Sequence, residues 1–160
     1  MKKILILGVI ILLFSGCSNE KEKHLTCTDV YIKKNDLKNG ITKDFEVIYN
    51  DDYVSYYKIN SYMPKDLIGV ETEKDLKEYV KFYKHSYPEQ FAFDGYNVSF
   101  KLDDEIVIVI LEVDMNIISI EELKDNKLIE NVMVKKDGDK DYFSYDGLME
   151  FFDGKECTDN

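Results

Sequence analysis

Three cysteines are the residues of this 160-residue chain whose positions point to covalent chemistry. Cys17 ends an apolar run, whereas Cys27 and Cys157 stand near the two ends of the remaining sequence. An odd number of cysteines in an exported protein leaves one of them without an intramolecular partner. We expect Cys27 and Cys157 to form a disulfide, with two free thiols as the alternative. Neither has a second cysteine or a histidine at the spacing of zinc ligands, so no metal site is predicted there.

The segment before Cys17 has the composition of an export signal. Lys2 and Lys3 give it a positive start, and Ile4 to Phe14 is an unbroken apolar stretch. About 20 apolar residues are needed to cross roughly 30 Å of hydrocarbon, so this stretch is too short for a permanent transmembrane helix. A charged start, a short apolar middle and small residues at the end predict a cleaved signal peptide over residues 1–16.

The end of this segment, Leu13-Phe14-Ser15-Gly16-Cys17, resembles the lipobox of bacterial lipoproteins. In that family a diacylglyceryl group is attached to the cysteine sulfur, and cleavage then makes the cysteine the first residue. Leu is usual three positions before the cysteine, where this chain has the apolar Phe14. The resemblance implies a covalent diacylglycerol on Cys17 and no other cofactor. Two acyl chains anchor a protein stably, so the chain is expected on the extracytoplasmic side of the cell membrane. A disulfide or a free thiol at Cys17 is the alternative.

The other reactive residues form no catalytic motif. His24 and His85 lack the H-E-x-x-H and G-x-S-x-G patterns, so neither zinc-dependent nor serine hydrolysis is predicted. The run Asp137-Gly-Asp-Lys-Asp141 begins like a calcium loop. However, Tyr142 stands where such a loop has Gly, and Leu148 stands where it has Glu. We therefore expect a solvated acidic turn without metal, and a protein that is not an enzyme.

Four tyrosines within residues 53–63 could form a binding surface. Side chains alternate along a strand, so Tyr53 and Tyr57 are expected on one face and Tyr56 and Tyr62 on the other. The outward pair would offer apolar rings with polar tips to a glycan or an envelope protein. Ordinary packing, in a chain that has no Trp, is the favoured alternative.

Hydrophobic patterning predicts the elements that position these residues. Strands are predicted where β-favouring residues are concentrated: 25–33, 43–50, 53–63, 96–102, 106–113 and 155–158. The strand at 106–113 is nearly all apolar and is expected to be buried on both faces. Asn39-Gly40 marks a turn over residues 35–40. Helices are predicted after the N-cap residues Thr72, Ser119 and Ser144: 73–87, 120–126 and 145–152.

This order of elements predicts one α+β domain over residues 25–160, after a lipidated tether at 17–24. Its mostly antiparallel sheet is expected to form a meander with helices on one face. The part of the chain from Phe45 to Glu122 contains three stretches, which precede ELK: FEVIYNDDYV, TEKDLKEYVKFYK and YNVSFKLDDEIVIVILEVD. Their layout resembles the small YehR-like bacterial lipoproteins, a family without an assigned activity. The resemblance includes no catalytic motif and implies the fold more than the function.

Acidic residues outnumber basic ones, with 32 Asp and Glu against 21 Lys and no Arg, for a net charge of −11. Removal of residues 1–16, with Lys2 and Lys3, would change the charge from −11 to −13. Such acidity disfavours nucleic acid as a partner. Our leading hypothesis is a monomeric, non-catalytic binding or interaction module of the envelope that contacts the membrane through its lipid. The alternatives are an accessory hydrolase and a purely structural envelope lipoprotein.

Overall fold

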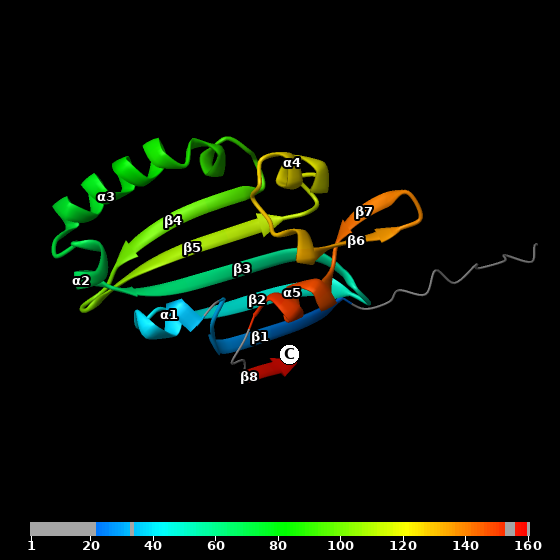
Figure 1. Ribbon diagram of the computed structural model, residues 1–160, viewed down its shortest axis with the longest axis horizontal. Coiled ribbons are helices and arrows are strands. Elements are labelled where there is room, and N and C mark those ends of the chain that lie inside the picture. Colours follow the sequence, from blue (N-terminus) through cyan, green and yellow to red (C-terminus); the bar gives the residue numbers. More distant parts are fainter. Residues whose placement is uncertain (1–21, 33, 153–155, 160) are drawn as a thin grey trace, which may run out of the picture.

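The computed structural model describes residues 22–32, 34–152 and 156–159. A six-stranded antiparallel sheet in the order β4-β5-β3-β2-β1-β8 forms one layer, and the helices lie on one of its faces (Figure 1). The strands of the sheet are β1 (Lys23–Val30), β2 (Thr42–Asn50), β3 (Tyr53–Pro64), β4 (Tyr96–Leu102), β5 (Ile106–Asp114) and β8 (Glu156–Asp159). A separate hairpin consists of β6 (Val134–Asp137) and β7 (Lys140–Phe143). This arrangement confirms the α+β fold class.

The predicted helices begin at their predicted caps. The Thr72 side chain accepts a hydrogen bond from the Asp75 backbone in a complete capping box, and Ser119 and Glu122 form a second box. Ser144 caps the last helix. The helices are α1 (Lys34–Lys38), α2 (Lys65–Ile68), α3 (Glu73–Ser86), α4 (Ile120–Asp125) and α5 (Tyr145–Phe151), with 3-10 turns η1 (Pro88–Phe91) and η2 (Asn131–Met133).

Two clusters of buried side chains cover the helix-bearing face of the sheet. The larger cluster joins β1, β2 and β3 to α4 and α5, and it includes Phe45, Leu123 and Leu148. The smaller cluster packs Leu76 of α3 against Val107 of β5. Because β3 is 12 residues long, the sheet extends beneath both clusters, and α3 covers one end while α5 lies over β1 and β2 (Figure 1). The two cores are therefore separate along the sheet.

A disulfide joins Cys27 of β1 to Cys157 of β8 across 130 residues of sequence. The two residues are direct partners in the antiparallel ladder, and their Cα atoms are 4.1 Å apart. Cys27 is fully buried. The bond predicted from the sequence thus fastens the C-terminal strand to the edge of the sheet.

The N-terminal part of the domain differs from the prediction in two ways. Strand β1 begins at Lys23, inside the segment expected to be a tether, because Lys23 and His24 pair with the end of β2. It ends at Val30 rather than at residue 33. The segment predicted as a turn at 35–40 contains α1, and Gly40 then adopts a left-handed conformation with φ 70°. Cys17 and the predicted signal peptide lie outside the described residues.

The centre of the sheet also corrects the prediction. Strand β5 pairs with β3 and leaves β4 at the edge, so the meander of β1, β2 and β3 does not continue in chain order. Ile108 and Ile110 of β5 are only partly buried, because the helices cover one face of this strand and not both. The acidic turn expected at Asp137–Asp141 is the tip of the hairpin, with Gly138 and Asp139 between the two strands, although β6 and β7 themselves were not predicted. Within the parts of the chain that the structure describes, no helix is long and apolar enough to cross a membrane.

Candidate functional site

A cavity of about 180 Å³ lies on the helix-bearing face of the sheet. We call it the sheet cavity. Its lining combines aliphatic side chains with two tyrosines and three other polar residues: Ile32, Lys43, Ile59, Ser61, Tyr83, Gln90, Tyr96, Val98, Val109 and Leu111. Ile59 and Leu111 belong to the larger core cluster and Val109 to the smaller one. The cavity therefore lies where the two cores meet without filling the space between them.

Strand register divides the floor of the sheet cavity into a polar and an apolar side. Lys43 of β2 stands directly opposite Ser61 of β3, and Ser61 stands opposite Val109 of β5. In the neighbouring row, Leu111 of β5 stands opposite Val98 of β4. The floor thus has the polar Lys43 and Ser61 on β2 and β3 and apolar side chains on β5 and β4, where Tyr96 adds a hydroxyl. Neighbouring strands are about 4.8 Å apart, so it extends about 14 Å.

Lys43 is the one charged residue that lines the sheet cavity. Its side chain is 8% exposed, and its Nζ atom lies 2.6 Å from Oδ2 of Asp36. Asp36 is on α1 and does not line the cavity. It also accepts a hydrogen bond from the backbone N–H of Ile32, which holds the carboxylate in place. Helix α1 therefore neutralises and orients a lysine that would be costly to bury alone.

Two tyrosines add polar atoms from the side of β4 and α3. The Tyr83 hydroxyl donates to Oε1 of Gln90 at 2.9 Å, which joins α3 to η1. Tyr96 is 5% exposed, and its hydroxyl has no side-chain hydrogen-bond partner among the described residues. Burial, followed by the nearby phenolic groups, raises the pKa of both tyrosines above 10.0. Both hydroxyls therefore stay protonated and can donate hydrogen bonds at neutral pH.

The four predicted tyrosines do not form one surface. Tyr57 is buried and packs on Phe143, with ring centroids 5.0 Å apart. A β-bulge between Tyr56 and Val54 changes the alternation, so Val54 and not Tyr53 shares the buried face with Tyr57. Tyr53 is instead stacked on Tyr142 of the hairpin at 4.3 Å. The expectation that Tyr53 and Tyr57 share a face is therefore wrong.

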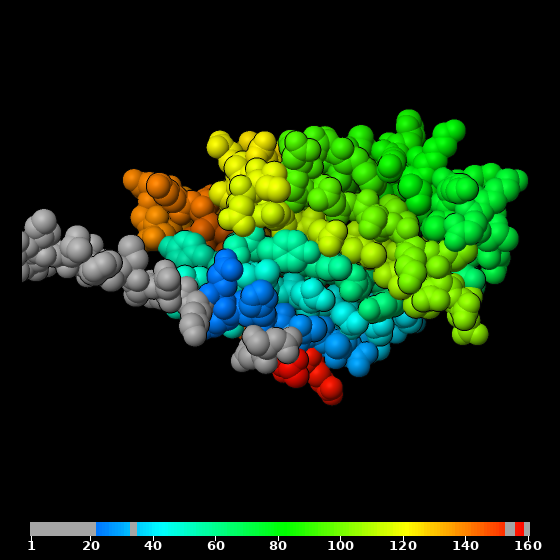
Figure 2. Space-filling view, turned by 180° about the vertical axis from the view of Figure 1, so that it is seen from behind, coloured from blue at the N-terminus to red at the C-terminus, as the bar shows by residue number. Residues whose placement is uncertain are grey.

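Tyr56 and Tyr62 lie on the face of the sheet opposite the helices, where β1, β3 and β5 form the surface in Figure 2. The Tyr62 hydroxyl donates to Asp44 at 2.7 Å, and the Tyr56 hydroxyl donates to Glu112 at 3.2 Å. Burial and these carboxylates raise the pKa of each tyrosine to about 12. Their polar tips are therefore engaged within the sheet, which favours the packing alternative over a platform for a ligand.

Asp52 is the centre of a hydrogen-bond network that resembles a reactive site. Its carboxylate accepts from the Tyr142 hydroxyl at 2.7 Å, the Ser144 hydroxyl at 2.9 Å, the Asp146 backbone N–H at 2.7 Å and Lys135 at 3.3 Å. Burial acts to raise the pKa of Asp52, but these hydrogen bonds outweigh it and lower the pKa below 3.8. Ser144 is fully buried and also accepts from the Gly147 backbone. The network joins the β2–β3 turn to the start of α5 and has a structural role.

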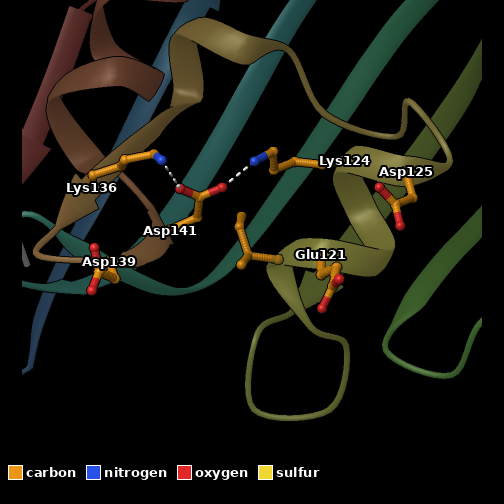
Figure 3. Close-up of a pocket in the computed structure, with 7 residues that line it drawn as sticks. Glu121, Lys124, Asp125, Lys136, Asp139 and Asp141 are labelled. Carbon is orange, nitrogen blue, oxygen red and sulfur yellow. Dashed lines mark hydrogen bonds and ion pairs between the residues drawn. The ribbon is translucent and has the colours of Figure 1, made fainter.

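A second hollow, of about 350 Å³, separates α4 from the hairpin (Figure 3). Asp141 lies between Lys124 and Lys136 and forms an ion pair with each. The bond from Lys124 is the main cause of the lowered pKa of Asp141. Asp137 accepts from Tyr53, and Asp139 lies at the turn of the hairpin. Asp137 and Asp141 therefore have separate partners, and the described residues contain no group of three or more potential metal ligands.

Sequence reasoning missed the residues of the sheet cavity. One signal was available: Lys43 alternates with Phe45 and Val47, so it occupies an inward position on an otherwise apolar strand face. Tyr83 lies in the predicted helix 73–87, but nothing local shows that it borders a cavity. Tyr96 and Val98 were predicted in a strand without a preferred face. Their convergence depends on how far α3 extends across the sheet.

Comparisons with known proteins agree with the fold. No family model matches the chain, and no curated protein sequence matches it. The NMR structure of the E. coli YehR protein is similar with a TM-score of 0.58 at 16% identity, covering 83% of this chain and 86% of that chain. An NMR structure of a protein from Streptococcus pneumoniae TIGR4 has a TM-score of 0.44 at 13% identity, covering 81% and 82%. The chain and YehR share a fold, as the sequence resemblance implied.

Proposed function

We propose that this chain is a bacterial envelope lipoprotein that acts as a non-catalytic binding module. A diacylglyceryl group on Cys17 holds it on the extracytoplasmic side of the membrane, and the sheet cavity is its binding site. The observation that carries the proposal is a cavity lined by aliphatic side chains and a few convergent polar groups, which is the usual composition of a small-molecule site.

The polar networks support a role in binding over one in hydrolysis. A serine hydrolase needs an accessible hydroxyl beside a histidine. Two serines donate to a carboxylate here: Ser144 to Asp52, where it is fully buried, and Ser119 to Glu122 in the cap of α4. His24 lies on β1 and His85 on α3, outside the network around Asp52. These positions favour the non-catalytic reading of the chain.

Binding in the cell can be tested by photo-crosslinking from the cavity wall. A photoreactive residue in place of Gln90, which lines the sheet cavity, should give a crosslinked product in intact cells. The matched control position is Lys101, an exposed residue of β4. It does not line the cavity, because it lies on the opposite face of β4 from Val98. A product specific to position 90 is expected, because only that side chain borders the cavity. Equal products at both positions, or none at position 90, would contradict the proposed site.

The anchor can be tested separately by metabolic labelling with an alkynyl fatty acid. The wild-type chain should incorporate the label, and Cys17→Ser should lose it, because the thioether sulfur is absent. Cys157→Ser is the matched control and should keep the label, since this cysteine belongs to the disulfide. Label retained by Cys17→Ser would refute lipidation at this residue.

A further inference from the structure

We propose that the sheet cavity binds an amphiphile that has an apolar body and a single carboxylate head, as in a medium-chain fatty acid. This inference rests on the proposed binding function and assigns a ligand class to the same site. It follows from the order of side chains along the floor, the charge of Lys43 and the polar groups that the protein leaves open.

The apolar body of such a ligand matches the β5 and β4 side of the floor. Val109 and Leu111 of β5 and Val98 of β4 line the cavity and are only partly buried by the protein itself. Contact with an acyl chain would remove this remaining apolar surface from water, which is favourable in proportion to the area covered. The floor extends about 14 Å from β2 to β4, which suits an extended chain better than a compact ring.

The head group is specified by Lys43 at the other side of the floor. An ammonium carries three N–H donors, and Asp36 is the one side-chain acceptor that the described residues provide for Lys43. Ser61 stands opposite Lys43 in the ladder, and its hydroxyl has no side-chain partner among the described residues. Lys43 therefore keeps donor capacity beyond its bond to Asp36, and since Lys43 and Ser61 both line the cavity, an acceptor with negative charge is favoured there.

A lysine between two carboxylates already occurs elsewhere in this chain. Nζ of Lys135 lies 3.3 Å from Asp52 and 3.0 Å from Asp146. Lys43 can bind Asp36 from the α1 side and a ligand carboxylate from the cavity side in the same manner. A cationic head would face Lys43 directly, and a purely apolar ligand would cover donors without satisfying them. The charge of the cavity therefore selects an acid over an amine of equal length.

The Tyr96 hydroxyl is a second observation that points to a ligand. Tyr96 lines the cavity and is only 5% exposed, but the described residues give its hydroxyl no side-chain partner. No fully enclosed side-chain oxygen or nitrogen among them lacks a partner, so this oxygen must reach open space. The Ser61 and Tyr96 hydroxyls can donate or accept, whereas the Lys43 ammonium can only donate, so an acceptor head group satisfies Lys43 and can also bond to either hydroxyl.

The test uses the full chain in phosphatidylcholine nanodiscs and a diazirine analogue of decanoic acid as a photoaffinity probe. Mass spectrometry should locate the label on peptides containing Val98, Val109 and Leu111. Excess decanoate should reduce labelling at least tenfold, whereas excess decylamine should not. Label distributed equally over both faces of the sheet, or equal competition by the acid and the amine, would overturn the proposal.

Two pairs of variants separate the head from the body of the ligand. Lys43→Met should lower labelling at least tenfold, and its control is Lys58→Met on the opposite face of the sheet. Val98→Trp fills the cavity and should abolish labelling while Lys43 is kept. Its control is Asn97→Trp, which adds the same ring on the opposite, exposed face of β4. If Lys43→Met does not fold, Val98→Trp decides, and wild-type labelling of that variant would refute the site.

The outcomes also distinguish this inference from the proposed function. If decanoate fails to compete while position 90 still yields a crosslinked product in cells, the ligand class is wrong and the binding function stands. Loss of both signals would overturn both.

Discussion

Replacing both cysteines of the disulfide, as Cys27→Ala with Cys157→Ala, is expected to lower the free energy of unfolding by about 4–5 kcal/mol. The bond closes a loop of 130 residues, and its removal restores the conformational entropy of that loop to the unfolded chain. Strand β8 has only four ladder positions on β1, so little else holds the C-terminal strand to the sheet edge. Much of the remaining stability should come from the two core clusters.

Urea denaturation followed by circular dichroism measures this effect. A reducing agent should destabilise the wild-type chain by a similar amount and should leave the double variant unchanged, which makes the reductant an internal control. A double variant within 1 kcal/mol of the oxidised wild type would show that the bond adds little, contrary to the loop-entropy argument.

The second large effect is expected at Asp52. Asp52→Asn should destabilise the fold by about 3 kcal/mol, because hydrogen bonds to a charged group contribute about 1.5–3 kcal/mol each and several are weakened together. The carboxylate holds Ser144, Tyr142 and the first turn of α5 to the β2–β3 turn. The matched control is Asp51→Asn on the same turn, where the side chain is exposed and the positive φ of 51° tolerates Asn.

The pH dependence of this effect has a definite sign. Hydrogen bonding holds the pKa of folded Asp52 below 3.8, whereas an unfolded Asp has a pKa of about 3.9. The stabilisation is therefore fully present above about pH 4 and is lost as the pH falls through the folded-state pKa. The difference in stability between wild type and Asp52→Asn should shrink below pH 4. A difference that stays constant or grows there would contradict the assigned network.

Local signals in the sequence were sufficient for the helices. Thr72, Ser119 and Ser144 each cap a helix through a side chain that bonds to backbone three residues ahead, so the information lies within one turn. The small α1 was missed because it has one turn only, and its Asn39-Gly40 end is also a strong turn signal.

Non-local pairing explains the features that could not be predicted. Nothing near β5 indicates that it pairs with β3 and places β4 at the edge. Its apolar composition suggested burial on both faces, but Ile108 and Ile110 face the side without helices. The bulge in β3 could not be predicted either, because it forms only against the partner strand. It places Val54 instead of Tyr53 on the face where Tyr57 is buried.

The sheet cavity was hidden for the same reason. Lys43 could be placed on an inward face from its alternation with Phe45 and Val47, yet a buried lysine alone does not indicate a site. The cavity exists because α3 and α5 cover different ends of a long sheet. Only the three-dimensional arrangement brings Lys43 and Tyr96 to the same space.

The most direct test of the account is methyl NMR of β5 in the full chain in nanodiscs, during a titration with octanoate. Neighbouring residues of this strand face opposite sides, with Val109 and Leu111 lining the sheet cavity and Ile108 and Ile110 on the face without helices. We predict saturable shifts of the Val109 and Leu111 methyl groups, little change at Ile108 and Ile110, and no saturation with octylamine. Shifts of equal size on both faces, or none at Val109 and Leu111, would contradict a binding site in this cavity.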